Sequence, residues 1–175
     1  LELELGRPDE LIAAMARGSL ELAICHVQNI DVPPTVHCSV LQELRAVAMA
    51  RADHPLLAGA PVPPAAVTSY GLASFPPYLN FVNWYAAQTG AQPDFALIGP
   101  DYEMLADAVA GSDLLLMCSH TQANRMARTH GLVELQVRWE PFLHRVCLLT
   151  SSRAISAPGK AIAGLIRDLM ATTEA

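Results

Sequence analysis

In the first third of the chain, the spacing of the apolar residues is in turn that of a strand, of a helix and of a strand again. Residues 1–5, LELEL, alternate apolar and acidic side chains, which predicts a strand. Residues 7–18, RPDELIAAMARG, have a proline and acids at the start, one apolar face and a closing glycine, which predicts a helix. Residues 20–27, LELAICHV, predict a second strand. Residues 36–52, VHCSVLQELRAVAMARA, predict extended segments joined near Gln42 and Glu43.

The middle of the chain predicts a strand followed by a helix three times. The proline-rich residues 54–71 come first and predict a passage from one lobe to the next. Each later helix candidate ends at a glycine, which adopts the left-handed conformation after a helix without a Cβ clash. Short apolar strands that alternate with helices predict an α/β fold with a mostly parallel sheet. The strand and helix pairs are residues 71–75 and 76–90, 93–99 and 100–111, and 113–119 and 120–131, and the glycines are Gly90, Gly111 and Gly131.

The last part of the chain predicts two strands and a closing helix. The strands are residues 132–137 and 142–152. Ser156 is placed to cap the helix, and Pro158 lies in its first turn, where a missing N–H costs nothing. The apolar residues of the helix form a single stripe, which predicts packing against an earlier part of the chain. The stripe consists of Ile162, Leu165, Ile166, Leu169 and Met170.

Composition and charge exclude several classes of protein. Of the 175 residues, 52% are hydrophobic and 16% are charged, against a usual charged share of about 25%, so the chain is folded around a sizeable core. A net charge of −6 provides no basic face for phosphates, which argues against nucleic-acid binding by this chain alone. The apolar runs are shorter than the ~20 residues of a membrane-spanning helix, and no signal peptide opens the chain. We therefore expect a cytoplasmic protein without membrane contact.

The four cysteines lie far apart in the sequence. Cys25, Cys38, Cys118 and Cys147 show no metal-ligand spacing, and each lies in or at the end of an apolar run. Reduced thiols on strands are the preferred interpretation, and the even count leaves disulfides as the alternative. We expect neither a metal nor another cofactor.

Four segments, in their order and spacing, resemble one protein family. They are LELELGRPDELIAAMARGSLELAI at 1–24, ARADHPLLAG at 50–59, YEMLADAVAGSDLLLM at 102–117 and SAPGKAIAGLIRDLM at 156–170. Together they cover nearly the whole chain and are similar to the effector-binding domain of LysR-type transcriptional regulators. The resemblance implies a type 2 periplasmic-binding-protein fold, in which two α/β lobes with Rossmann-like, mostly parallel sheets are joined by two crossover segments around a small-molecule site.

The resemblance also implies how the lobes divide the chain. Lobe I comprises residues 1–67 and 142–175, and lobe II comprises residues 68–141. Family members carry an N-terminal winged helix-turn-helix, a linker helix, and a first strand and helix of lobe I, none of which this sequence includes. Asp113 and Ser119 stand where the family tends to have glycine and proline. His54, within a recurring family motif, is interpreted as structural.

Residues 114–123, LLLMCSHTQA, raise the question of catalysis. A nucleophile needs a base within hydrogen-bond reach and a group that orients this base, but Ser119 and His120 are adjacent, and neighbours at a strand end point apart. No GxSxG motif surrounds the serine, so we expect no enzyme. A zinc site from Cys25, His26, His37 and Cys38 is also disfavoured, because adjacent strand residues face opposite sides of a sheet.

Position favours a binding pocket at the ends of the strands. In open α/β sheets, ligands gather beyond the carboxyl ends of strands, where helix N-termini present free N–H groups. Hydroxyls there suit a carboxylate, while aromatic rings suit an apolar body. Ser119 and Thr121 have the alternative role of capping the following helix, which suits Thr121 as well as a ligand contact does, and Asp101 is interpreted as a cap. The predicted ligand-binding residues are Ser74, Phe75, Pro76, Tyr102, Ser119, His120 and Thr121, with Cys25 and His26 from lobe I.

The resemblance implies that the chain is a sensor. A small anionic metabolite would bind in the cleft between the lobes and change the lobe arrangement. This change would pass through a homodimer or homotetramer to DNA-binding domains outside this chain, in a bacterial regulator. The alternative is a solute-binding protein of a transporter, which uses the same lobes.

Overall fold

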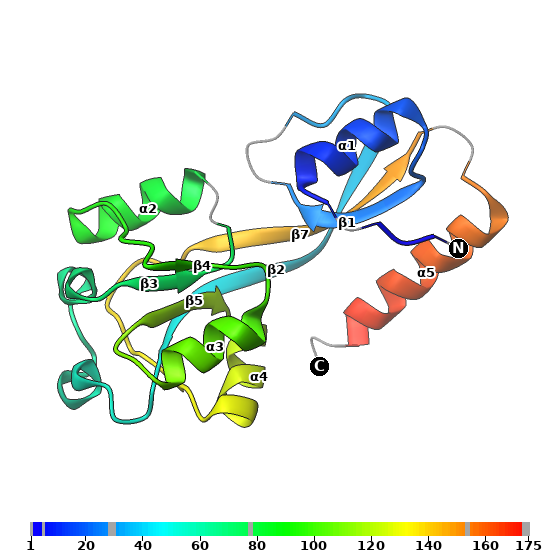
Figure 1. Cartoon of the computed structure of the whole chain (residues 1–175). Helices are drawn as coiled ribbons and strands as arrows, with labels where there is room; N and C mark the ends of the chain where they lie inside the picture. The colour runs from blue at the N-terminus through cyan, green and yellow to red at the C-terminus, as the bar shows by residue number, and fades with distance from the viewer. Residues whose placement is uncertain (1, 5, 28–30, 77–78, 153–154, 173–175) are drawn as a thin grey trace. The chain divides into compact units, whose positions relative to one another are not determined.

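The computed structural model describes residues 2–4, 6–27, 31–76, 79–152 and 155–172, and its elements are labelled in Figure 1. The described residues form two compact units. Unit 1 consists of residues 1–43 and 144–175, and unit 2 of residues 44–143. The expected lobe borders were 67/68 and 141/142. The first border of the units falls earlier than expected because residues 44–67 pack within unit 2, where Val62 N–H donates to Gln136 O.

Unit 1 is a small α/β unit. Helix α1 (Pro8–Arg17) and strand β1 (Leu22–His26) are followed by the first part of β2 (Val36–Ala50), and β7 (Leu143–Ser151) and α5 (Ala157–Thr172) complete it. Strand β1 pairs antiparallel with β7, and β7 neighbours β2. The apolar side of α1 covers this sheet, and its core residues are Ile12, Met15, Ala23, Cys25, Val36, Cys147 and Leu149.

Local signals explain the ends of the unit 1 helices. Arg7 N–H donates to the Glu10 carboxylate at the start of α1, and Gly18 ends this helix in the left-handed conformation. Ser156 Oγ accepts from Gly159 N–H at the start of α5, which confirms the predicted cap.

The predicted strand at residues 1–5 is not confirmed. Residues 2–4 form no strand, and Leu1 and Leu5 lie outside the described residues. Alternation makes a strand stable only when a neighbouring strand takes up its hydrogen bonds. In the described part of unit 1, β1 is the last strand of the sheet on this side.

Unit 2 contains the three predicted strand and helix pairs. Strands β3 (Leu72–Ser74), β4 (Leu97–Ile98) and β5 (Leu115–Ser119) are parallel, in the order β4-β3-β5. The second part of β2 pairs antiparallel with β5 and with β6 (Val133–Glu134). The expected α/β class is confirmed, with a mixed sheet. The proline-rich passage forms two short 3-10 helices, η1 (Pro55–Gly59) and η2 (Pro64–Ser69).

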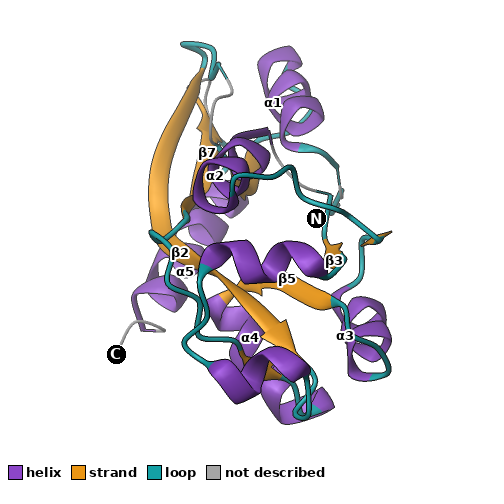
Figure 2. Cartoon of the chain, turned by 90° about the vertical axis from the view of Figure 1, so that its left-hand side faces the viewer, coloured by secondary structure: helices purple, strands orange, loops and turns teal. Residues whose placement is uncertain are grey.

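Helices cover both faces of the unit 2 sheet. Leu116 and Cys118 of β5 face α3 (Tyr102–Ala110) and α4 (His120–His130). Leu115 and Met117 face α2 (Leu79–Thr89) and η2. This alternation is why the run 115–118 is wholly apolar: both of its faces are buried. Figure 2 shows α2 on one side of β5 and α3 with α4 on the other.

Two local predictions are wrong. The extended segments expected to join near Gln42 and Glu43 form one strand, β2, which neighbours β7 and pairs with β5 at residues 46–49. Gly111 is not left-handed (φ −99°), since its N–H still bonds to Asp107 O within the last turn of α3. Gly90 and Gly131 do adopt positive φ, as predicted.

Candidate functional site

The carboxyl ends of the three parallel strands of unit 2 lie at one edge of the sheet. Ser74 of β3 is in register with Ile98 of β4 and Met117 of β5. Gly99 N–H donates to Ser74 O over 3.2 Å, which joins the ends of β3 and β4. The predicted residues Ser74, Phe75, Tyr102 and Ser119 therefore come from neighbouring strand ends and the helix starts that follow them.

An aromatic pair lies at the end of β3. The rings of Phe75 and Tyr102 are stacked, with centroids 5.5 Å apart and planes 23° apart. Phe75 is 41% exposed, whereas Ser74 beside it is buried and its hydroxyl donates to Phe75 O. Pro76 is exposed next to this pair. A stacked pair with one open ring face suits a flat or apolar ligand body.

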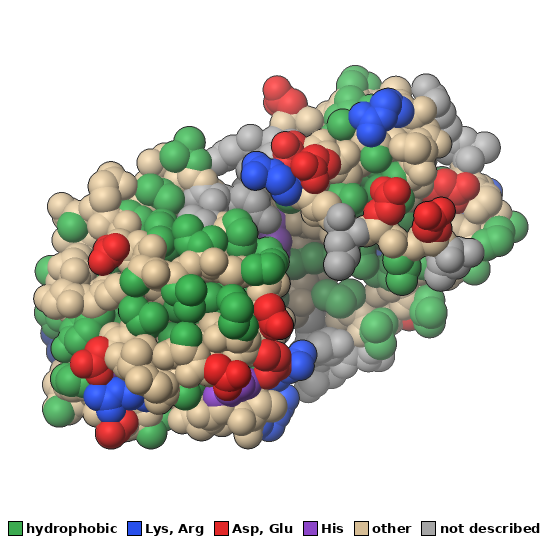
Figure 3. Space-filling view, viewed as in Figure 1, with side chains coloured by type: hydrophobic (Ala, Val, Ile, Leu, Met, Phe, Trp, Pro, Cys, Tyr) green, Lys and Arg blue, Asp and Glu red, His purple; other side chains and the backbone are tan. Residues whose placement is uncertain are grey.

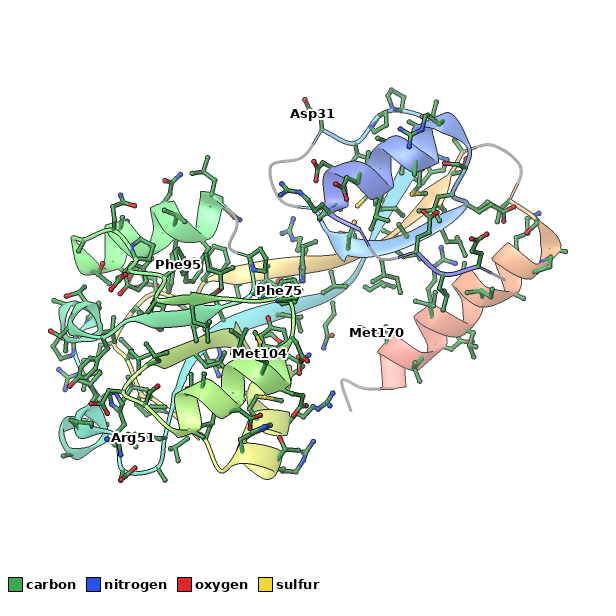
Figure 4. The ribbon with its side chains drawn as sticks, in the orientation of Figure 1. Asp31, Arg51, Phe75, Phe95, Met104 and Met170 are labelled. Carbon is green, nitrogen blue, oxygen red and sulfur yellow. The ribbon has the colours of Figure 1, made fainter. Side chains whose placement is uncertain are left out.

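Two further exposed apolar side chains extend this edge. Ile98 at the end of β4 is 50% exposed and Met104 on α3 is 45% exposed. Figure 4 labels Phe75 at the end of β3 and Met104 on α3, and Figure 3 shows hydrophobic side chains gathered over this part of unit 2. Neither residue was among the predicted ligand-binding residues, because the sequence alone does not show that an apolar side chain on a strand or helix is exposed.

A hydroxyl pair lies at the end of β5. Ser119 Oγ accepts from Gln122 N–H and caps α4, and it lies 2.9 Å from Thr121 Oγ1. Ser119 is buried and Thr121 is exposed. The cap is thus provided by Ser119, which leaves the Thr121 hydroxyl at the surface, where it can reach a ligand. Asp101 caps α3 by accepting from Glu103 N–H, as predicted.

The contacts of Cys118, Ser119 and His120 bear on the question of catalysis raised by residues 118–120. His120 Nδ1 accepts from Arg45 N–H of β2, so this nitrogen is already occupied. Cys118 is 5% exposed, and burial raises the pKa of its thiol to about 12, which keeps it protonated at neutral pH. The cluster is arranged as a helix start and not as a nucleophile with its base.

The predicted residues of unit 1 lie at the end of β1. Cys25 is buried in the core opposite Cys147, whereas the His26 ring packs edge-on against His144 with centroids 4.7 Å apart. Burial lowers the pKa of His26 below its usual value. Within the described ranges, no group of three or more His, Cys, Asp or Glu side chains is placed to hold a metal ion.

A cavity of about 630 Å³ lies in unit 1, and none of the predicted ligand-binding residues lines it. Leu22 and Ile24 of β1 form one wall of this cavity, and Ile162 and Ile166 of α5 form another. Its lining is mainly apolar, and Glu2, Glu4 and Glu21 also belong to it. Because it offers apolar side chains and carboxylates, it does not fit a small anion.

His54 and Arg51 form hydrogen bonds with other residues at the end of unit 2 that carries η1. His54 is 2% exposed; its Nδ1 accepts from Leu56 N–H, and its Nε2 lies 3.2 Å from Asp113 O. Arg51 donates twice to the Asp113 carboxylate. Figure 4 labels Arg51 near η1. The structural interpretation of His54 is confirmed, while the Arg51–Asp113 pair had no signal in the sequence because its members are 62 residues apart.

Comparisons with known proteins give one family and many structural neighbours. The family model described as the LysR substrate binding domain matches residues 1–171. No curated protein matches the sequence well enough to count as a relative. None of the described helices combines the length and hydropathy that a bilayer-spanning segment needs.

Three solved structures show the same fold at low sequence identity. A probable transcriptional regulator of Pseudomonas aeruginosa, PA0477, has a TM-score of 0.74 and 20% identity; the match covers 90% of this chain and 52% of that one. The CcmR regulatory domain of Synechocystis, in complex with 2-PG, has a TM-score of 0.74 and 15% identity; the match covers 93% of this chain and 79% of that one. The effector-binding domain of QuiR, in complex with shikimate, has a TM-score of 0.72 and 15% identity; the match covers 95% of this chain and 79% of that one. The chain therefore spans about half the length of the first regulator, and the expected type 2 periplasmic-binding-protein fold is confirmed.

Proposed function

Since the chain belongs to the LysR substrate-binding domain family of transcriptional regulators, we propose that it senses a small anionic metabolite. The observation that carries this proposal is the edge of unit 2, where exposed apolar side chains lie beside hydroxyls at helix starts. Such an edge matches a carboxylate attached to an apolar or flat body.

The polar and apolar parts of the edge have separate roles in this proposal. Thr121 and the first turn of α4 bind the carboxylate, because a helix N-terminus presents N–H groups and a positive dipole end. Phe75, stacked on Tyr102, covers the body of the ligand, with Ile98 and Met104 beside it. Two neighbours that bind small molecules, 2-PG in CcmR and shikimate in QuiR, support an effector of this size.

Signalling by the sensor requires two arrangements of its lobes. In the proposed mechanism, the effector binds in the cleft that the family resemblance implies, with His26 on the lobe I side. The predicted contact from Cys25 is not kept, because this side chain lies in the core of unit 1. Binding shifts the lobes only as far as the effector prefers one arrangement over the other. The shift reaches DNA through a homodimer or homotetramer and an N-terminal DNA-binding domain of a cytoplasmic regulator. This role needs no cofactor and no catalysis.

A solute-binding protein of a transporter is the second candidate, because the two kinds of protein share the fold. The family match over residues 1–171 favours the regulator. If chromatography showed that the protein converts a bound compound into a product, the protein would instead be an enzyme.

The test is a thermal-shift screen with small aromatic and aliphatic carboxylates, followed by calorimetric titration of each hit. A ligand of the folded state raises the melting temperature with concentration. We expect Thr121→Val to weaken binding about tenfold, the usual effect of a lost hydrogen bond to a charged group. We expect Ser74→Ala to weaken binding less, because the Ser74 hydroxyl donates to Phe75 O and acts on the ligand only through the position of Phe75. Thr68→Val is the matched control, because Thr68 is an exposed hydroxyl that bonds locally to Ala65 O.

The outcomes of the screen separate the proposals. Unchanged affinity in both site variants would show that the contacts are assigned wrongly. The absence of any shift with a folded protein would contradict an anionic effector. Loss of affinity in Thr68→Val as well would mean that the substitutions act through general stability.

A further inference from the structure

Three of the four cysteines lie on three neighbouring strands of unit 1. Cys25 of β1 is directly opposite Cys147 of β7, and β7 neighbours β2, which carries Cys38. Ser39 Oγ donates to Leu148 O over 3.2 Å, so β2 and β7 lie side by side at residues 39 and 148. The Cys38 and Cys147 thiols are within hydrogen-bond reach of each other. The three thiols therefore form a row across the sheet, while Cys118 lies in unit 2.

The three thiols differ in their access to solvent. Cys38 is exposed, whereas Cys25 is 8% and Cys147 is 2% exposed. Burial raises the pKa of Cys25 to about 11. The pKa of Cys147 is raised to about 12, mainly by burial and then by the neighbouring Cys38 thiol. A dissolved oxidant therefore reaches Cys38 first, and Cys147 stays a protonated thiol directly behind it.

We propose that Cys38 and Cys147 are a redox-active thiol pair that a hydroperoxide converts into a disulfide. In the first step, the Cys38 sulfur attacks the terminal peroxide oxygen, the O–O bond breaks, and Cys38 becomes a sulfenic acid while water or an alcohol leaves. In the second step, the Cys147 sulfur attacks the Cys38 sulfur, and the hydroxyl leaves as water with the thiol proton. The peroxide is reduced by two electrons, and the two thiols lose two hydrogens.

The order of the strands selects Cys147 as the partner of Cys38. Strands β2 and β7 are neighbours, so their backbones are about 4.8 Å apart, whereas β1 is two spacings, roughly 10 Å, from β2. A disulfide needs Cα atoms within about 7 Å of each other. Cys25 is therefore too far from Cys38 and is expected to stay reduced.

The position of the bond gives it a regulatory role. Strand β2 continues from unit 1 into unit 2, and β7 begins at Leu143, the last residue of unit 2. A disulfide between residues 38 and 147 would tie together the two chain segments that connect the units. The oxidised protein is then expected to differ from the reduced protein in how freely the units rearrange.

The test treats the reduced protein with hydrogen peroxide and maps its thiols. We expect the count of free thiols to fall from four to two, with a mass loss of two hydrogens. Peptide mapping should find a link between Cys38 and Cys147, and dithiothreitol should restore all thiols. A link between two copies of the chain, or sulfinic acid on Cys38 without any link, would overturn the proposal in the unmodified protein.

Single substitutions identify the partner thiol. Cys147→Ser should abolish the link and leave Cys38 to gain oxygen instead, while Cys25→Ser and Cys118→Ser should leave the link intact. Because serine at residue 147 is buried, Cys147→Ala is the second variant, and far-ultraviolet circular dichroism checks its fold. Loss of the link in Cys25→Ser with retention in both residue 147 variants would show that the pair is assigned wrongly.

Discussion

Replacement of His54 by alanine is expected to lower the free energy of unfolding of unit 2 by about 3 kcal/mol. The ring is 2% exposed, packs on Tyr70 with centroids 4.6 Å apart, and bonds at both nitrogens. Alanine leaves a cavity and deprives Leu56 N–H and Asp113 O of these partners. Urea unfolding followed by tryptophan fluorescence measures the change, because Trp84 and Trp139 both lie in unit 2.

Two further variants separate packing from hydrogen bonding at this position. His54→Phe keeps a ring against Tyr70 but removes both hydrogen bonds, so a smaller loss than in His54→Ala is expected. His37→Ala is the matched control, because His37 is exposed on β2. A change in His54→Ala no larger than that in His37→Ala would show that the ring is not a structural support.

Leu116→Ala is expected to lower the free energy of unfolding of unit 2 by about 3–4 kcal/mol, the usual range for a fully buried leucine. Leu116 is 0% exposed on β5 and faces α3 and α4, so the surrounding side chains cannot collapse fully into the space. The same urea titration measures the loss as a shift of the unfolding midpoint with an unchanged slope.

Leu79→Ala is the control for this second prediction. Leu79 begins α2 in the same unit and is 74% exposed, so its loss is expected to change stability by less than about 0.5 kcal/mol. If both leucine variants lost the same amount, the assignment of β5 to the centre of the unit 2 core would be contradicted.

The alternation of strands and helices in unit 2 was predictable because each element carries its own local signal. Gly90 and Gly131 end helices in positive φ, and Asp101 and Ser119 follow strands and cap helices. The continuity of β2 was not predictable, because the polar residues Gln42 and Glu43 resemble a turn until the neighbouring strands are known. Pairing across the sheet is a long-range property that periodicity along one segment does not contain.

The candidate site was predictable in its position but not in its detailed contacts. The rule that ligands gather beyond strand ends selected Phe75, Tyr102 and Thr121, and the structure places these residues at one edge of unit 2. The rule does not reveal that His120 Nδ1 is occupied by Arg45 N–H, since Arg45 is 75 residues away in the sequence. Whether these residues bind an effector stays a prediction.

The outer edge of β1 has a consequence for the behaviour of the isolated chain in solution. In the described part of unit 1, no strand covers this edge, and Leu165 and Leu169 of α5 are 68% and 64% exposed. Open strand edges beside apolar surface favour aggregation by strand pairing between molecules. The acidic Glu2 and Glu4 at the cavity act against this through like-charge repulsion, which salt screens. Colloidal stability of the purified chain should therefore decrease as ionic strength rises.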